Sequence, residues 1–270
     1  MRRRRTWDIG LRTTKTTNKH TILPFLETDR LYAAYAIGDM EPDMFKQCTW
    51  ALALRHGEPQ ALALHYRGLN PPALFLMGDD EGVEDLLAHE LHPKRVYVTC
   101  REEHLSTAFQ FYHWEEIEPM WRLVVRAEQF LPTSGQCSRL TAADLDELRA
   151  LYSRGGADAF APSQLEKGVF YGVRSRGMLL SAAGTHLVSV NYGVAAVGNV
   201  FTHPEHRRQG WGRQVTSAVV HDLLVLGIRD VVLNINQENT GAVHTYESLG
   251  FIRYCPFVEG RATAARGLCL

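Results

Sequence analysis

Short apolar runs and amphipathic stretches alternate along the second half of this chain. Apolar runs at residues 194–201 and 230–235 predict two buried strands. Between them, residues 210–226 place apolar positions three and four apart, which predicts an amphipathic helix. The pattern therefore indicates the order strand, helix, strand.

A hairpin and a capped helix are predicted ahead of these elements. Strands at residues 169–173 and 178–190 flank the turn signal Ser175-Arg176-Gly177. Residues 141–152 predict a helix, because Thr141 and Asp144 form a capping pair before apolar positions at helical spacing.

The first half of the chain shows the same order of elements. Its pattern predicts helices at residues 28–40, 81–91 and 102–112, and strands at residues 50–54, 60–65, 73–77, 95–100 and 121–126. We therefore predict an α/β (α+β) fold built from two tandem copies of one module, each with a mixed central sheet flanked by helices.

The domain boundaries follow from composition and turn signals. Residues 132–135 (Pro-Thr-Ser-Gly) read as a linker, which divides the chain into domains at residues 21–131 and 132–270. Residues 1–20 are basic, Thr-rich and aperiodic, so a disordered basic arm is expected there. A tether to nucleic acid or to an anionic surface is the alternative reading of this arm.

Composition favours a folded protein of the reducing cytoplasm. Apolar residues make up 45% of the 270 residues and charged residues 22%, which predicts a hydrophobic core. The five cysteines are scattered without a Cys-x-x-Cys pair, so neither a disulfide framework nor a zinc site is expected. No apolar run reaches the length of a membrane span, and the N-terminus has no secretory signal pattern. The net charge of −1 gives no global argument for a nucleic-acid partner.

A glycine-rich basic turn joins the strand at residues 194–201 to the following helix. It reads Arg207-x-x-Gly210-x-Gly212 and meets the start of the helix, where unpaired N–H groups and the helix dipole favour an anion. It is not a P-loop, which needs Gly-x-x-x-x-Gly-Lys-Ser/Thr. It also lacks the third glycine of a dinucleotide-binding fingerprint.

A second motif follows the strand at residues 230–235. It reads Asn239-x-x-Ala242-x-x-x-Tyr246-x-x-x-Gly250-Phe251, with Asn239 as a helix cap and Gly250 as a helix end. Together the two motifs resemble the signatures of the GCN5-related N-acetyltransferase (GNAT) superfamily. The first half resembles a degenerate copy of the same module, as in proteins similar to glycine N-acyltransferases.

The resemblance implies the acyl-CoA N-acyltransferase fold, with acetyl-CoA (or another acyl-CoA) as co-substrate. In that fold the strand before the loop splays from its parallel neighbour, and the pantetheine arm enters the gap. The implied binding residues lie at the strand end, in the loop and at the following helix start: Val200, Phe201, Thr202, Arg207, Arg208, Gln209, Gly210, Trp211, Gly212, Arg213, Asn239 and Ala242.

The resemblance also assigns proton transfer. Tyr246 stands where the superfamily places its general acid, and a phenol suits a thiolate leaving group. Many relatives carry a glutamate on the strand before the loop, but residues 195–202 contain no acid. His186 on the neighbouring strand is the best titratable candidate for the base, because a histidine pKa lies near neutrality. The spacing of His203, His206 and His244 does not suggest a metal site, so no metal is expected.

The first half is not expected to bind CoA in the same way. Its corresponding turn carries Asp79, Asp80 and Glu81, which suit a helix N-terminus but would repel a pyrophosphate. Its expected role is structural, or to wall one side of an acceptor pocket.

The resulting function is acyl-CoA-dependent N-acetyltransfer to a primary amine by direct attack, in the cytoplasm and without a membrane. A small-molecule acceptor is preferred over a protein terminus, nucleic acid is not an expected partner, and a homodimer stays open. Alternatives are a longer-chain or glycine-type N-acyltransferase, and a non-enzymatic acyl-CoA sensor.

Overall fold

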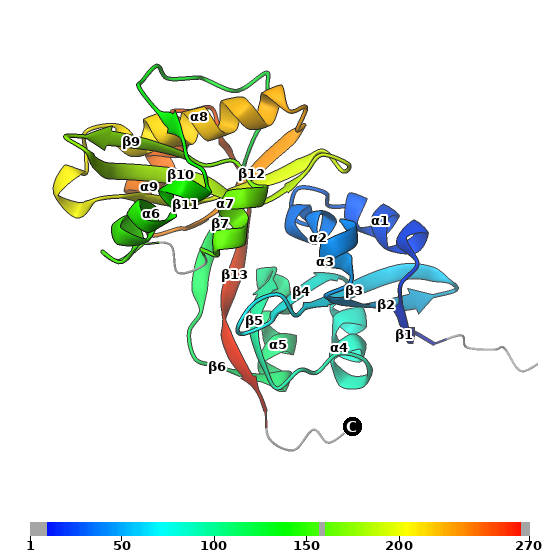
Figure 1. Cartoon of the computed structure of the whole chain (residues 1–270). Coiled ribbons are helices and arrows are strands. Elements are labelled where there is room, and N and C mark those ends of the chain that lie inside the picture. The colour runs from blue at the N-terminus through cyan, green and yellow to red at the C-terminus, as the bar shows by residue number, and fades with distance from the viewer. Residues whose placement is uncertain (1–9, 157–159, 266–270) are drawn as a thin grey trace, which may run out of the picture. The chain divides into compact units, whose positions relative to one another are not determined.

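A computed structural model describes residues 10–156 and 160–265 (Figure 1). The chain forms two compact units, each assembled from separate segments. The first unit takes the described residues of Met1–Asp29, Pro42–Pro119 and Pro256–Leu270, and the second takes Arg30–Glu41 and Met120–Cys255.

The first unit is built on a mixed sheet. Its strands lie in the order β1 (Arg12–Thr16), β2 (Cys48–Arg55), β3 (Glu58–Tyr66), β4 (Ala73–Gly78), β5 (Arg95–Cys100) and the later part of β13 (Ile252–Ala264), with β6 (Tyr112–Trp114) also on β13. Strands β4 and β5 are parallel and the other paired strands are antiparallel. Helices of this unit are α1 (Lys19–Glu27), α3 (Pro42–Phe45), α4 (Asp80–His89) and α5 (Leu105–Phe111).

The second unit repeats this topology. Its strands lie in the order β8 (Ser138–Arg139), β9 (Tyr171–Ser175), β10 (Met178–Ser189), β11 (Val194–Thr202), β12 (Asp230–Asn236) and β7 (Glu118–Val125), followed by the first residues of β13. Strands β11 and β12 are parallel, and β12 pairs with β7 antiparallel. Its helices are α2 (Ala34–Gly38), α6 (Leu145–Tyr152), α7 (Pro162–Lys167), α8 (Trp211–Val225) and α9 (Thr240–Glu247).

Helices cover both faces of this second sheet. Val215 and Val219 of α8 pack in one cluster with Ala195 of β11. Ala196 points to the opposite face, because successive strand residues alternate, and it packs with Ala34 of α2. Helices α6 and α7 form a further cluster, with Phe201 and Ala182 among its strand residues.

The repeated order of strands confirms the prediction of two copies of one α/β module. The copies also exchange a strand. Strand β7 follows the elements of the first copy in sequence but pairs with β12, and β13 follows the second copy but pairs with β5. The compact units are therefore discontinuous in sequence, whereas the sequence predicted contiguous domains at residues 21–131 and 132–270.

Two predictions at the N-terminus are wrong. Residues 28–40, predicted as one helix, form turns and the short helix α2, and the longer helix α1, which the Asn18 side chain caps, lies before them. Residues 12–16, predicted as part of a disordered arm, form β1, because their β-branched threonines suit an edge strand beside β2. Residues 1–9 of that arm lie outside the described residues.

Two expectations from composition can be compared with the described residues. Among the described residues, Cys48, Cys100, Cys137 and Cys255 are not joined in disulfides. Within the same residues, no helix combines the length and the apolar character that crossing a lipid bilayer requires.

Candidate active site

Strands β11 and β12 separate halfway along their length. Their parallel pairing runs from Val194 opposite Asp230 to Val197 opposite Leu233. Beyond this point β11 continues to pair with β10 as far as Thr202, and β12 continues to pair with β7 as far as Asn236. Both strands thus stay in the sheet while a gap opens between residues 198–202 and 234–236.

A bulge marks the point of separation. The register between β10 and β11 shifts beside Gly198, and Asn199 takes a left-handed conformation with φ 51°. A side chain at position 198 would displace His186, because a Cβ there would lie 2.2 Å from His186 Nε2. The Tyr152 hydroxyl donates to the Asn199 carbonyl oxygen at 2.6 Å, which holds the bulge from the side of α6.

The loop after β11 ends in an open helix start. Gly210 is the N-cap of α8 with φ 84°, and an added Cβ would meet no atom within 4 Å. The space beside Gly210 is thus open, and the first N–H groups of a 15-residue helix suit an anion. The predicted strand, glycine turn and helix are therefore all present.

The arginines of this loop differ in their partners. Arg207 donates from Nε to the Thr202 carbonyl oxygen at 3.3 Å, and its guanidinium lies 5.6 Å from the centre of the Phe201 ring. Arg213 donates to the Ser248 carbonyl oxygen at 3.3 Å. Both side chains therefore tie the loop to its neighbours, while Arg208 is exposed with φ 61°.

The second motif forms helix α9 as predicted. The Asn239 side chain caps it by accepting from the Ala242 amide at 3.2 Å. Tyr246 is 7% exposed and packs with Leu233 and Phe251, in a cluster that Val200 and Ala242 also contact. Burial raises the pKa of Tyr246 to about 12, so the phenol keeps its proton at neutral pH.

His186 lies at the bulge but does not have the proton affinity that the sequence suggested. Its Nδ1 is 3.0 Å from the Tyr35 hydroxyl, and its Nε2 faces Gly198. Burial lowers the pKa of His186 to about 4, with Asn199 acting in the opposite direction. The expectation of a pKa near neutrality is therefore wrong, because desolvation disfavours the imidazolium.

Three neighbours of this site were not found from the sequence. Tyr35 comes from α2 in the first half of the chain, and Tyr152 and Gln164 come from α6 and α7. Gln164 accepts from the Asn199 side-chain amide at 3.2 Å. No motif contains these residues, and only the tertiary fold brings them to β11.

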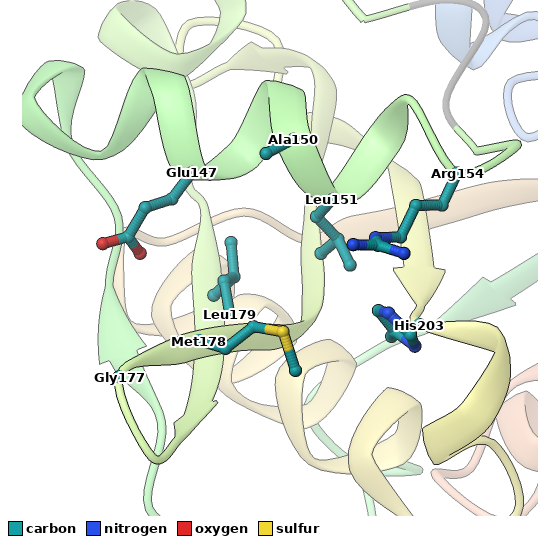
Figure 2. Close-up of a pocket in the computed structure, with 8 residues that line it drawn as sticks. All are labelled: Glu147, Ala150, Leu151, Arg154, Gly177, Met178, Leu179 and His203. Atoms are coloured by element: carbon teal, nitrogen blue, oxygen red, sulfur yellow. The ribbon is translucent and has the colours of Figure 1, made fainter.

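The end of β11 also borders a pocket of about 200 Å³ (Figure 2). Leu151 of α6 and Arg154, in the turn after this helix, line it together with Met178 and Leu179 of β10 and His203. The sequence predicts no metal site at His203 and His206, and that expectation stays a prediction. His203, Glu205 and His206 place one ligand atom each within 4.8 Å of one another.

The gap at a bulge, the glycine loop and the open helix start define the acyl-CoA N-acyltransferase fold. A sequence model of the FR47-like protein family matches residues 170–259. The chain is 30% identical over 138 residues to a [ribosomal protein bS18]-alanine N-acetyltransferase of Escherichia coli K12, covering 49% of this chain and 91% of the relative.

Solved structures match nearly the whole chain at the level of fold. A Drosophila protein has a TM-score of 0.71 at 10% identity, covering 93% of this chain and 99% of its own. A tandem GNAT protein from the clavulanic acid biosynthesis pathway has a TM-score of 0.56 at 15% identity, covering 96% and 100%. The chain belongs to the GNAT superfamily, and this homology supports acetyltransferase activity in general.

Proposed function

We propose that the second unit transfers an acetyl group from acetyl-CoA to a primary amine. The observation that carries this proposal is the gap between β11 and β12, which leads to the open helix start at Gly210. The gap fits an extended pantetheine arm and the helix start fits a pyrophosphate. Acetyl-CoA would supply the acyl group as a thioester held by Val200, Phe201 and Thr202, by the loop and by Asn239.

The residues around the gap suggest how protons move. Backbone N–H groups at the end of β11 would polarise the acyl carbonyl, as oxyanion donors do. Tyr246, protonated at neutral pH, would donate to the departing thiolate. A histidine with a pKa of about 4 is a weak base, so His186 would orient the amine rather than take up its proton. The amine would therefore attack in its neutral form, and the proton that its nitrogen loses as the amide forms would pass through solvent to the Tyr246 phenolate, which restores the acid.

The acceptor has two candidates. A small-molecule amine remains the first, because Tyr35 and His186, which lie beside the bulge, are both largely buried. The N-terminal amine of a protein is the second, favoured by the similarity to an enzyme that acetylates an alanine of ribosomal protein bS18. Thiol release from acetyl-CoA, measured with a panel of small amines and with a peptide that begins with alanine, separates the two.

The loop can be tested directly by the substitution Gly210→Glu. It should abolish acetyl-CoA binding, because it places a side chain and a negative charge where the pyrophosphate would lie. Gly227→Glu is a matched control at the other end of α8, since Gly227 has φ 83° and equally open surroundings. Isothermal titration with acetyl-CoA should show loss of binding only in Gly210→Glu. Equal affinity in both folded variants would remove the assignment, and tight binding without turnover on any amine would favour an acyl-CoA sensor.

A further inference from the structure

A short 3₁₀ turn separates β11 from the glycine loop and carries two histidines. The turn spans Pro204–His206 and follows His203. The His203 amide donates to the Leu180 carbonyl oxygen at 2.8 Å, and the His206 amide donates to the His203 carbonyl oxygen at 2.8 Å. These bonds fix the turn to the sheet. His203 is the N-cap of the turn, and its ring packs against the ring of His206.

The spacing of the two imidazoles matches that of rings sharing a metal ion. Their ring centroids are 5.3 Å apart and their planes meet at 63°. A ring nitrogen bound to zinc at about 2.0 Å puts each centroid about 3.2 Å from the ion, so tetrahedral geometry separates two centroids by about 5.2 Å. Glu205 lies between them in sequence and adds a carboxylate oxygen to the same cluster.

We propose that His203, Glu205 and His206 form a binding site for a divalent transition-metal ion, with Zn²⁺ as the expected ion. Two imidazole nitrogens and one carboxylate oxygen are a ligand set that zinc accepts, with one position left for water or another ligand. His203 is buried and serves as the fixed ligand, while the more exposed Glu205 and His206 can adjust.

The charges around this cluster are mixed. Glu205 supplies a negative charge and the neighbouring Arg207 turns its guanidinium toward Thr202 and Phe201, whereas Arg154 lines the same pocket as His203. In the present geometry His203 Nδ1 accepts from the Glu205 amide at 3.3 Å. This hydrogen bond is long, so its replacement by a metal bond costs little.

The test is titration of the full chain, without a polyhistidine tag, with Zn²⁺ in a calorimeter and with Co²⁺ in a visible spectrometer. We expect one ion per chain and the strong visible absorption of tetrahedral Co²⁺. His206→Ala should weaken Zn²⁺ binding at least about tenfold, because it removes one ligand atom from the site. Glu205→Gln should weaken it less, because glutamine keeps a side-chain oxygen. His244→Ala is the matched control, since His244 also lies beside a carboxylate, 3.4 Å from Glu247, but belongs to no cluster of three potential ligands among the described residues.

The experiment measures metal binding and not acetyl transfer. Its result therefore tests the metal site independently of the proposed function. Circular dichroism of the metal-free variants confirms that each is folded. Absence of Zn²⁺ binding by the unmodified chain would overturn the proposal. Equal affinity in the unmodified and His206→Ala chains would overturn it as well.

Discussion

Tyr246 and His186 lie in surroundings that change their proton affinities in opposite directions. Burial raises the pKa of Tyr246 to about 12 and lowers the pKa of His186 to about 4. Both shifts favour the neutral form, because a low-dielectric environment penalises charge. At neutral pH neither side chain is charged, so the acceptor amine is expected to set the rise of turnover with pH.

The role of Tyr246 can be tested by Tyr246→Phe. This change removes the hydroxyl and keeps the ring that packs 5.9 Å from Phe251. Turnover should fall roughly 100-fold, the scale of general acid catalysis, while the affinity for acetyl-CoA changes little. Steady-state kinetics and calorimetry measure the two quantities. The same substitution at the exposed Tyr254 serves as control, and unchanged turnover in Tyr246→Phe would end the assignment.

His186 should also make stability depend on pH. The unfolded chain binds a proton at His186 with a pKa near 6.5, whereas the folded chain binds it near 4. Protonation therefore favours unfolding: the contribution is complete above pH 6.5 and is lost as the pH falls toward 4, on the order of 3 kcal/mol in total. Urea unfolding at pH 4.5 and 7.5 should show a smaller loss for His186→Gln than for the unmodified chain. An equal loss in both would mean that other groups cause it.

At the scale of elements, the sequence predicted the strands and helices around the gap well. Strand β11, helix α8, strand β12 and helix α9 have strong apolar runs and explicit caps, which are local signals. Helix α2 has no such signal. It is only five residues long, its N-cap Ala33 makes no side-chain cap, and its tertiary contacts with β10 and β11 define it. The contribution of Tyr35 to the site was missed for the same reason, since it depends on contacts across 151 residues of sequence.

A buried carboxylate attaches the segment that carries α2 to the second unit. Asp230, fully buried at the start of β12, accepts from Arg30 at 2.8 Å and from Arg126 at 2.7 Å. Burial alone would raise the pKa of Asp230, but the hydrogen bonds from Arg30, Arg126 and Arg229 lower it overall. The carboxylate is thus held ionised by groups from three parts of the chain.

Removing one of these partners should loosen the segment without unfolding the unit. Arg30→Ala should cost about 1–3 kcal/mol in the free energy of unfolding, because Asp230 loses one hydrogen-bonded charge but keeps two. Turnover should fall as well, since Arg30 precedes Tyr35 on the same short segment. The exposed Arg149, which lies 3.9 Å from Asp146, provides the control Arg149→Ala, expected to change stability by less than about 0.5 kcal/mol. Chemical denaturation of both variants measures the difference.

At the scale of the whole molecule, the exchanged strands make neither sequence half self-sufficient. A fragment of residues 132–270 contains every motif of the predicted catalytic domain but lacks β7 and the segment Arg30–Glu41. Without β7, strand β12 loses its antiparallel partner over six residue pairs, from Val231 to Asn236. The fragment would also leave Val232 and Ala196 without the cover of Ala34 and Val124.

We therefore expect the 132–270 fragment to lack cooperative unfolding and acetyl-CoA binding when produced alone. An exposed strand edge and an uncovered apolar face both favour aggregation over folding. Production together with a fragment of residues 1–131, which supplies β7 and α2, should restore a complex with the affinity of the intact chain. Calorimetry with acetyl-CoA and size-exclusion chromatography report both results. A 132–270 fragment that folds and binds by itself would show that the motifs, and not the exchanged strand, carry the stability of the second unit.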